Sequence, residues 1–288
     1  MKPSKGWEGQ EPSPPIRAVF RKRIPKTGEW LPAIGLGSSR TFDADPKASH
    51  PALEQVLSHF LDFGGSLVDS SPMYGQAEAL IGSLVRSLDR RDLFFATKVW
   101  TAEGKKAGIA QMESSQEKME ADRIDLMQIH NLVGLETHLP TLREWKAEGR
   151  IRYLGITEMR DWERIEQLIL KQDLDFIQIP YSLAFRKAEE RILPAARDHG
   201  VAVLVMRPFE RGRLFRQVQG KELPPWAATF GIRSWAQFFL KYLLAHPAVS
   251  CPIPATSKPH HLIDNMGAGH GPLPDEATRR KMVAWLES

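Results

Sequence analysis

A short apolar run followed by a longer segment of helical periodicity recurs eight times along the 288-residue chain. The apolar runs are nearly continuous, which is typical of parallel strands that are buried on both faces. The expected strands are 33–37, 66–70, 93–99, 124–130, 153–157, 176–180, 201–206 and 249–254. The expected helices are 51–63, 78–87, 108–120, 136–148, 161–170, 188–198, 234–245 and 259–266, with a last helix at 275–287.

Eight strand–helix units predict an α/β fold, a (β/α)8 TIM barrel with a C-terminal extra helix. Gly64, Gly149 and Gly200 stand where three of the helices are expected to end. A doubly wound open sheet is the alternative, but no G-x-G-x-x-G follows an early strand. Ahead of the first strand, RIPKTGEWLPAIG has a Thr-Gly turn between two short extended pieces. This stretch predicts an N-terminal β-hairpin that plugs the bottom of the barrel.

Barrels of this length form one domain, so we expect residues 17–288 to be a single domain. Residues 1–16, rich in Pro, Gly, Ser and Glu, predict a loose N-terminal tail. The first fifteen residues contain no apolar core of a secretory signal, and no stretch of ~18 apolar residues follows. A cytoplasmic location is therefore expected, with export of the folded protein to the periplasm as the alternative if a signal was removed. The single cysteine, Cys251, lies in an apolar run and is expected to be a buried small hydrophobe.

The net charge of +4 is too small to indicate nucleic-acid binding. The histidines show no ligand spacing, so no metal site is expected, and a metal-dependent barrel hydrolase would lack its ligands. One basic cluster is expected to be a solvated strand and turn. It consists of Arg17, Arg21, Lys22, Arg23 and Lys26.

Polar side chains follow three neighbouring strands of the predicted barrel. Asp69 ends the second strand, and Tyr74 lies in the turn beyond it. Lys98 ends the third strand and His130 the fourth. The carboxyl ends of barrel strands share one rim, where active sites of such barrels lie, so the four should converge on one pocket.

These four residue types together suit carbonyl chemistry. A tyrosine has a pKa near ~10, and a nearby lysine ammonium lowers it. Asp69 would pair with Lys98, His130 would hydrogen-bond a substrate oxygen, and Tyr74 would donate a proton to that oxygen. A carbonyl that gains a proton on oxygen needs a hydride on carbon, and no side chain supplies one. A nicotinamide cofactor is therefore implied.

Several motifs, in one order from Arg23 to Leu286, resemble those of the aldo-keto reductase family. Asp-Ser-Ser-Pro-Met-Tyr-Gly, residues 69–75, is similar to the family's Asp-x-x-x-x-Tyr-Gly motif, ATKVW to its Thr-Lys strand end and IDLMQIHN to its Asp-Leu-x-x-x-His segment. KAEGRIRYLGIT and IPATSKPHHLIDN resemble two later family segments. The resemblance is to bacterial, short-loop members. It implies that Tyr74 is the general acid of a tetrad and that NADPH is the cofactor.

The resemblance also assigns a cofactor site along three stretches of the chain. Its residues are Thr157 and Gln178 at the nicotinamide carboxamide; Met206, Arg207, Pro208, Phe209, Gly212 and Leu214 around the nicotinamide and pyrophosphate; and Thr256, Ser257, Lys258, His261, Asp264 and Asn265 at the phosphate and adenine end.

Three residues depart from the family pattern. Glu158 stands where the family often has Asn or His, and a carboxylate cannot donate to the carboxamide oxygen. Met206 replaces a common aromatic residue under the nicotinamide. His261 stands where Arg is frequent, so a preference for NADPH over NADH depends mainly on Lys258.

The predicted substrate is an aldehyde or ketone of modest size. Trp100, two residues past Lys98, is the candidate wall of the pocket. The segment after His130 is short and the chain ends soon after its last helix, so the site is expected to be open. We expect a monomer or weak homo-oligomer with no nucleic-acid or membrane partner. The alternative function is a non-catalytic NADPH-binding sensor or partner subunit on the same fold, which the intact tetrad disfavours.

Overall fold

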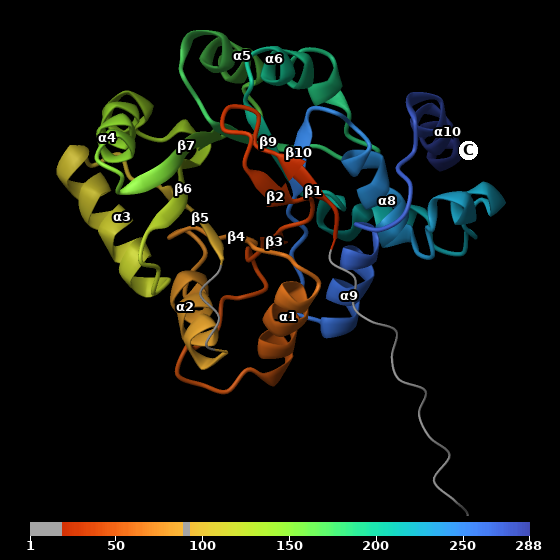
Figure 1. Cartoon of the computed structure of the whole chain (residues 1–288), viewed down its shortest axis with the longest axis horizontal. Helices are drawn as coiled ribbons and strands as arrows, with labels where there is room; N and C mark the ends of the chain where they lie inside the picture. The colour runs from red at the N-terminus through yellow and green to blue at the C-terminus, as the bar shows by residue number, and fades with distance from the viewer. Residues whose placement is uncertain (1–18, 89–92) are drawn as a thin grey trace, which may run out of the picture.

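The computed structural model describes residues 19–88 and 93–288; the expected tail, 1–16, and Arg17 lie outside this range. Eight parallel strands form one curled sheet in the order β10-β9-β8-β7-β6-β5-β4-β3, with the helices around its outside (Figure 1). The strands are β3 Leu36–Gly37, β4 Leu67–Asp69, β5 Phe94–Val99, β6 Ile124–Ile129, β7 Ile151–Thr157, β8 Phe176–Pro180, β9 Ala202–Met206 and β10 Val249–Pro252. The helices are α1 Pro51–Asp62, α2 Ala77–Ser87, α3 Lys105–Lys118, α4 Leu135–Ala147, α5 Trp162–Lys171, α6 Ile192–Asp198, α7 Arg213–Gln217, α8 Trp235–Leu244, α9 Pro259–Gly267 and α10 Glu276–Glu287.

The sheet closes between its first and last strands. The backbone N–H of Gly35 donates to Pro252 O at 3.0 Å, and that of Gly37 donates to Pro254 O at 3.1 Å. A side chain at Gly37 would bring a Cβ within 2.8 Å of the Ile253 carbonyl oxygen, so the closure requires glycine there. The (β/α)8 prediction is confirmed, and the open-sheet alternative is wrong.

The predicted hairpin is also confirmed, as β1 Arg21–Arg23 and β2 Trp30–Pro32, paired antiparallel. Its Ile24 and Leu31 are buried in the cluster that fills the barrel interior. That cluster also holds a stacked pair of rings, Phe94 and Tyr153, with centroids 5.8 Å apart. The hairpin therefore closes the amino-terminal end of the barrel, as predicted.

Within the basic cluster on the hairpin, the prediction of solvated side chains is wrong for Lys22. Its ammonium donates to the carbonyls of Leu244 at 2.7 Å, His246 at 3.2 Å and Val249 at 2.7 Å. Burial lowers the pKa of Lys22 to about 8. The Lys22 ammonium thus links the end of α8 to the start of β10. The sequence around Lys22 gives no indication of this contact.

Cys251 lies inside the barrel and is fully buried, as predicted. Burial raises the pKa of its thiol well above the ordinary range, so the sulfur is held as the unreactive thiol. Within the described residues, no helix is long and apolar enough to span a membrane. The same ranges contain no group of three or more His, Cys, Asp or Glu side chains placed to hold a metal ion.

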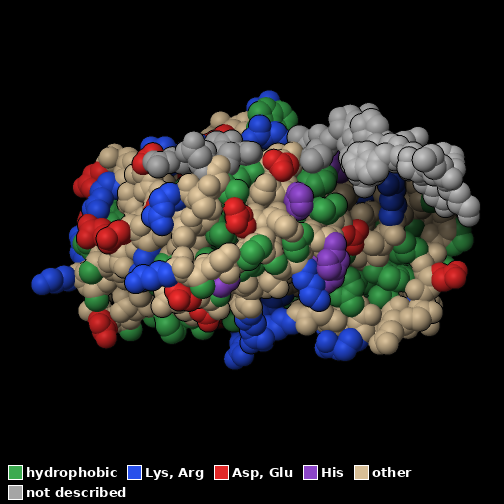
Figure 2. Space-filling model, turned by 90° about the horizontal axis from the view of Figure 1, so that it is seen from below, with side chains coloured by type: hydrophobic (Ala, Val, Ile, Leu, Met, Phe, Trp, Pro, Cys, Tyr) green, Lys and Arg blue, Asp and Glu red, His purple; other side chains and the backbone are tan. Residues whose placement is uncertain are grey.

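The surface carries charges of both signs. In Figure 2, acidic and basic side chains are interspersed over most of the visible face, and Lys and Arg side chains gather along the middle of its lower edge. This mixture agrees with the small net charge of +4.

Candidate active site

Strand alternation places a polar layer directly above the apolar interior. On β5, Phe94 and Ala96 belong to the interior cluster, so Lys98 is the next side chain that points inward. Parallel pairing sets Lys98 beside Gln128 on β6 and Thr157 beside Gln178 on β8. On each of these strands, the apolar side chains at the alternate positions point outward and pack against the helices. The polar layer lies at the carboxyl ends of the strands, where the sequence predicted a site.

Lys98 and Asp69 form a fully buried ion pair. The Lys98 ammonium donates to both carboxylate oxygens of Asp69, at 2.9 and 2.8 Å, and to Ser70 O at 2.7 Å. Lys98 is 0% and Asp69 3% exposed. Burial is the largest single influence on the pKa of Lys98 and acts to lower it. The charge and hydrogen bonds of Asp69, with smaller contributions from Tyr74 and Glu78, together outweigh burial, so the net shift is upward. Gln128 completes the arrangement by donating its Nε2–H to Asp69 at 3.2 Å.

Tyr74 lies against this ion pair and against His130. The Lys98 ammonium is 5.3 Å from the centroid of the Tyr74 ring. The rings of Tyr74 and His130 are nearly perpendicular, with centroids 5.9 Å apart. Burial raises the pKa of Tyr74, and Lys98 opposes this shift without reversing it. The expected lowering by Lys98 is thus present but smaller than the effect of burial, and Tyr74 keeps its proton at neutral pH.

The turn that follows Tyr74 is tightly packed. Gly75 has φ +61°, and a Cβ at this position would lie 2.1 Å from the Asp43 carboxylate. That carboxylate accepts a hydrogen bond from the Gln76 N–H at 3.0 Å. Gly75 is therefore required both by its left-handed backbone and by the close approach of Asp43, and together they fix where Tyr74 lies.

His130 is 6% exposed, and its Nδ1 lies 3.0 Å from the Ser71 hydroxyl. Burial, and then the charge of Lys98, lower the pKa of His130 to about 3. The imidazole is therefore neutral at physiological pH. A neutral ring has one donor and one acceptor nitrogen, which suits a residue that orients a carbonyl oxygen.

Trp100 lies beside His130 at the mouth of the site. It is 39% exposed, and its ring centroid is 6.4 Å from that of His130. The amide of Gln111, on α3, holds its backbone from both sides: Trp100 N–H donates to Oε1 at 2.5 Å, and Nε2 donates to Trp100 O at 3.1 Å. The next carbonyl, that of Thr101, is 2.8 Å from His138 Nε2. The predicted pocket wall is therefore rigidly supported.

The residues expected at the nicotinamide carboxamide are buried, and one is unsatisfied. Thr157 accepts a hydrogen bond from the Asn131 N–H at 3.0 Å. Gln178 Nε2 and Gln128 Oε1 have no hydrogen-bond partner among the described residues. A buried amide without a partner is costly, and a carboxamide bound beside it would supply one. The polar layer therefore fits a nicotinamide.

Glu158 turns toward its own loop. Its Oε1 accepts hydrogen bonds from the N–H groups of Met159 at 2.7 Å and Arg160 at 2.8 Å. The carboxylate thus stabilises the backbone that leads into α5. These hydrogen bonds give the acidic side chain a role in the loop, at a position where the family often has a residue that donates to the nicotinamide carboxamide.

The loop after β9 has an unusual backbone and a concentration of positive charge. Arg207, Glu210 and Arg211 have φ of 54°, 49° and 55°. Burial lowers the pKa of Arg207, and the charges of Arg211, Arg40 and Arg160 add to this shift. In the described part of the chain, none of these four arginines makes an ion pair. Such a cluster suits a pyrophosphate, which would neutralise it.

Backbone strain concentrates at the same rim. Residues other than glycine rarely adopt positive φ, and such residues cluster at functional sites. Those at the carboxyl ends of the strands are Arg40, Asn131, Leu132, Arg207, Glu210 and Arg211, whereas Glu120 lies at the end of α3.

The expected phosphate and adenine residues surround the start of α9. Lys258 is exposed and precedes Pro259, the first residue of this helix, whose backbone N–H groups have no side-chain cap. Burial lowers the pKa of His261, so this residue is neutral. Asp264 accepts a hydrogen bond from Gln237 Nε2 at 2.8 Å, and Asn265 is buried. An uncapped helix start beside a lysine fits a phosphate group.

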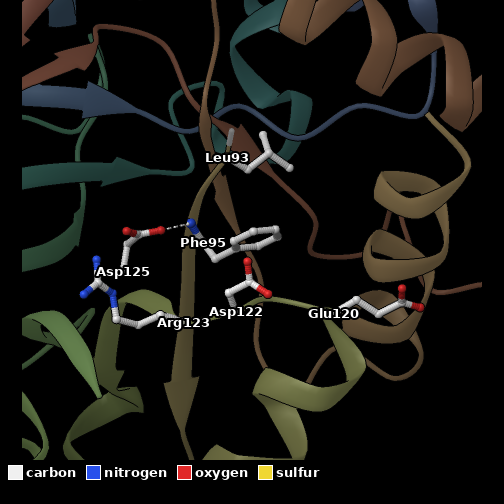
Figure 3. Close-up of a pocket in the computed structure, with 6 residues that line it drawn as sticks. All are labelled: Leu93, Phe95, Glu120, Asp122, Arg123 and Asp125. Atoms are coloured by element: carbon white, nitrogen blue, oxygen red, sulfur yellow. Dashed lines mark hydrogen bonds between the residues drawn. The ribbon is translucent and has the colours of Figure 1, made fainter. Parts of the chain in front are cut away.

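A cavity of about 170 Å³ lies at the opposite end of the barrel (Figure 3). Leu93, Phe95 and Asp125 line it near the starts of β5 and β6, and the Asp125 carboxylate accepts a hydrogen bond from the Phe95 N–H at 2.8 Å. A second cavity, of about 180 Å³, lies between Tyr242 on α8 and Arg279 on α10. Neither cavity includes the tetrad, so neither serves the chemistry at the strand ends.

Sequence reasoning missed Gln128 and Ser71. Gln128 lies on β6 two residues before His130, which directly follows that strand, and Ser71 lies just past the end of β4, two residues after Asp69. Gln128 has the inward parity of its strand neighbour Lys98, and Ser71 stands at the spacing of two residues from Asp69. The two-residue alternation of strands would have identified Gln128 as a candidate; Ser71 lies beyond its strand and has no such signal.

Comparison with known proteins finds one family over most of the chain. The model described as the aldo/keto reductase family matches residues 33–281. The chain is 30% identical over 211 residues to the aldo-keto reductase YhdN of Bacillus subtilis (strain 168), covering 66% of this chain and 62% of that protein. It is 31% identical over 214 residues to the NADH-specific methylglyoxal reductase of Escherichia coli (strain K12), covering 65% and 64%. The matches span less than two thirds of the length of either relative.

A solved structure of an aldo-keto reductase from Klebsiella pneumoniae in complex with NADPH superimposes with a TM-score of 0.78. The match covers 94% of this chain and 95% of that protein at 23% identity. At this level of identity the likeness concerns the fold.

Proposed function

The chain belongs to the aldo/keto reductase family of oxidoreductases, and from this we propose that it is an enzyme that reduces aldehydes or ketones to alcohols with NADPH. The observation that carries the proposal is the buried Lys98 ammonium, held by both oxygens of Asp69 and lying 5.3 Å from the Tyr74 ring centroid. A protein that used the fold only as a scaffold would have no need to keep this ion pair in the barrel.

Each of the four residues has a separate task in the proposed reaction. Tyr74 donates its proton to the carbonyl oxygen as negative charge develops there. Lys98 stabilises the phenolate that remains, and Asp69 keeps Lys98 charged and aimed. His130, neutral because of burial, donates a hydrogen bond to the same oxygen. A bound reduced nicotinamide supplies the hydride to the carbonyl carbon.

We propose that the cofactor contacts follow the family pattern. The unpartnered Nε2 of Gln178 would donate to the carboxamide oxygen, and Thr157 lies beside it in register. Arg207 and Arg211 would meet the pyrophosphate. Lys258 and the uncapped start of α9 would meet the 2′-phosphate of NADPH.

The preference for NADPH is a separate proposal. The Klebsiella protein was solved with NADPH, whereas the Escherichia relative is described as NADH-specific. Lys258 supports NADPH, because a 2′-phosphate gives it a partner that NADH lacks. The neutral His261 adds little charge there, so we expect a preference rather than strict specificity.

We propose a small carbonyl compound as the substrate. The segment between β6 and α4 is short, since α4 begins at Leu135, and Trp100 forms the apolar wall beside His130. A rigid aromatic wall over a polar layer suits an aldehyde with a compact apolar or aromatic side.

The test is reduction of a panel of aromatic and aliphatic aldehydes, followed by the absorbance of NADPH, with NADH in parallel. Consumption of NADPH that depends on the aldehyde supports the enzyme. Tight NADPH binding, measured by quenching of protein fluorescence, without turnover on any aldehyde would favour the sensor alternative. Absence of binding to either nucleotide would contradict both.

A further inference from the structure

Ser71 is fully buried and lies between the active-site turn and His130. It is 0% exposed, and its Oγ is 3.0 Å from His130 Nδ1. The same oxygen accepts a hydrogen bond from the backbone N–H of Met73 at 3.2 Å. The family motifs that predicted the tetrad assign no role to this hydroxyl.

The two contacts determine the direction of the hydrogen bond to His130. A serine hydroxyl has one hydrogen to donate and two lone pairs to accept with. The Met73 N–H occupies one lone pair, and His130 Nδ1 is the acceptor within hydrogen-bond distance in the described part of the chain. A buried hydroxyl hydrogen takes an available acceptor. The hydroxyl of Ser71 therefore donates to Nδ1.

A nitrogen that accepts a hydrogen bond carries no proton. Burial and the neighbouring Lys98 ammonium keep the His130 ring neutral, so it holds one proton in all. With Nδ1 as the acceptor, that proton is on Nε2. The Nε2 atom makes no hydrogen bond to any residue that the structure describes, and so remains free for a ligand.

We propose that Ser71 is a positioning residue, whose hydroxyl holds His130 as the Nε2–H tautomer so that the ring donates a hydrogen bond to the carbonyl oxygen. The opposite tautomer would turn a nitrogen lone pair toward that oxygen and repel it. The kinetic consequence rests on the proposed function, but the tautomer is a property of the protein itself.

The tautomer is measured directly by long-range proton–nitrogen correlation NMR on protein with ¹⁵N-labelled histidine. The signals of His130 are those that disappear in His130→Gln. We expect wild type to show a neutral ring protonated at Nε2, and Ser71→Ala to show a mixture of the two tautomers. The matched control is Ser70→Ala, which removes the adjacent buried hydroxyl. Ser70 contacts Ser38 Oγ at 3.0 Å, so its loss should leave the His130 pattern as in wild type.

Kinetics tests the positioning role separately. Loss of the orienting hydrogen bond should lower kcat/KM for aldehyde reduction about 5- to 10-fold in Ser71→Ala, since one hydrogen bond contributes ~1 kcal/mol. The Kd for NADPH, measured by fluorescence, should stay within about 2-fold, because Ser71 acts through His130 and not through the cofactor site. Ser71→Cys, which keeps a weak donor of similar shape, should fall between wild type and Ser71→Ala and serves if the alanine variant does not fold.

The outcomes separate the two proposals. A wild-type ring protonated at Nδ1 would overturn the assignment of the tautomer. An unchanged Nε2–H pattern in Ser71→Ala would overturn the proposal that Ser71 holds that tautomer. A changed tautomer with unchanged kcat/KM would overturn the positioning role. If wild type shows the expected tautomer but reduces no aldehyde, the proposed function fails while the assignment for His130 stands.

Discussion

The Lys98 ammonium bonds both carboxylate oxygens of Asp69, at 2.9 and 2.8 Å, in a layer of the barrel from which solvent is excluded. Removing one partner of a buried ion pair leaves the other charge uncompensated. Neither partner can therefore be lost alone without destabilising the protein, and the pair supplies the positive charge beside Tyr74.

Asp69→Asn should lower the free energy of unfolding by about 3 kcal/mol, because Lys98 would remain buried without an anionic partner. Denaturant unfolding measures this change. Asp173→Asn is the control, since Asp173 pairs with Lys26 at an exposed position and should lose less than ~1 kcal/mol. Equal losses in the two variants would contradict the assigned role of Asp69.

Lys258→Ala should raise the Kd for NADPH about tenfold, because one charge-assisted contact to the 2′-phosphate is lost. NADH is the matched control, as it lacks that phosphate, and its Kd should change by less than about 2-fold. Fluorescence titration of each nucleotide gives both values. Parallel weakening of both would mean that Lys258 does not contact the 2′-phosphate.

The ammonium of Lys22 bridges three backbone carbonyls at the bottom of the barrel. Lys22→Met should destabilise the protein by about 2 kcal/mol, since these carbonyls lose a charged donor. The neighbouring Arg23 is exposed and lies over the Trp30 ring at 4.4 Å, so Arg23→Met should cost under ~1 kcal/mol. Thermal or denaturant unfolding compares the two, and a larger loss for Arg23→Met would contradict the structure.

The buried His130 makes stability depend on acid pH. Its pKa is about 3 in the folded protein and near 6.5 for an ordinary histidine, so the unfolded chain binds a proton more readily. The free energy of unfolding should therefore fall as the pH falls from about 6.5 toward 3, by up to ~1.4 kcal/mol per pH unit for this residue. Denaturant titrations at about pH 6, 5 and 4 measure how the free energy of unfolding changes with pH. In His130→Gln, the part of this pH dependence that comes from His130 should be absent. An identical slope in wild type and variant would exclude the assignment.

Much of the fold and the core of the site could be predicted from the sequence because both depend on local periodicity. Apolar runs of five to seven residues predict strands, and the strand ends of such a barrel share a rim. Asp69, Lys98 and His130 are therefore brought together by topology alone. The inward parity of alternating strand positions directs Lys98 into the barrel above Phe94 and Ala96.

The remaining features depend on side-chain torsions and on contacts between distant segments. Lys22 and Val249 are 227 residues apart, and nothing near Lys22 indicates that its ammonium points inward. The sequence indicates only that the Glu158 carboxylate cannot donate a hydrogen bond to the nicotinamide carboxamide. In the structure this carboxylate instead accepts a hydrogen bond from the backbone of its own loop. The left-handed backbone at Arg207 and Arg211 has no local sequence signal such as glycine.

The measurement that tests the central claim most directly is the kcat of Tyr74→Phe for NADPH-dependent reduction of an aldehyde that the wild type accepts. Phenylalanine keeps the ring beside Lys98 and His130 and removes the proton donor. We predict a loss of at least ~10²-fold in kcat, with the Kd for NADPH little changed. A variant that retains kcat within a few-fold of wild type would contradict the assignment of Tyr74 as the general acid.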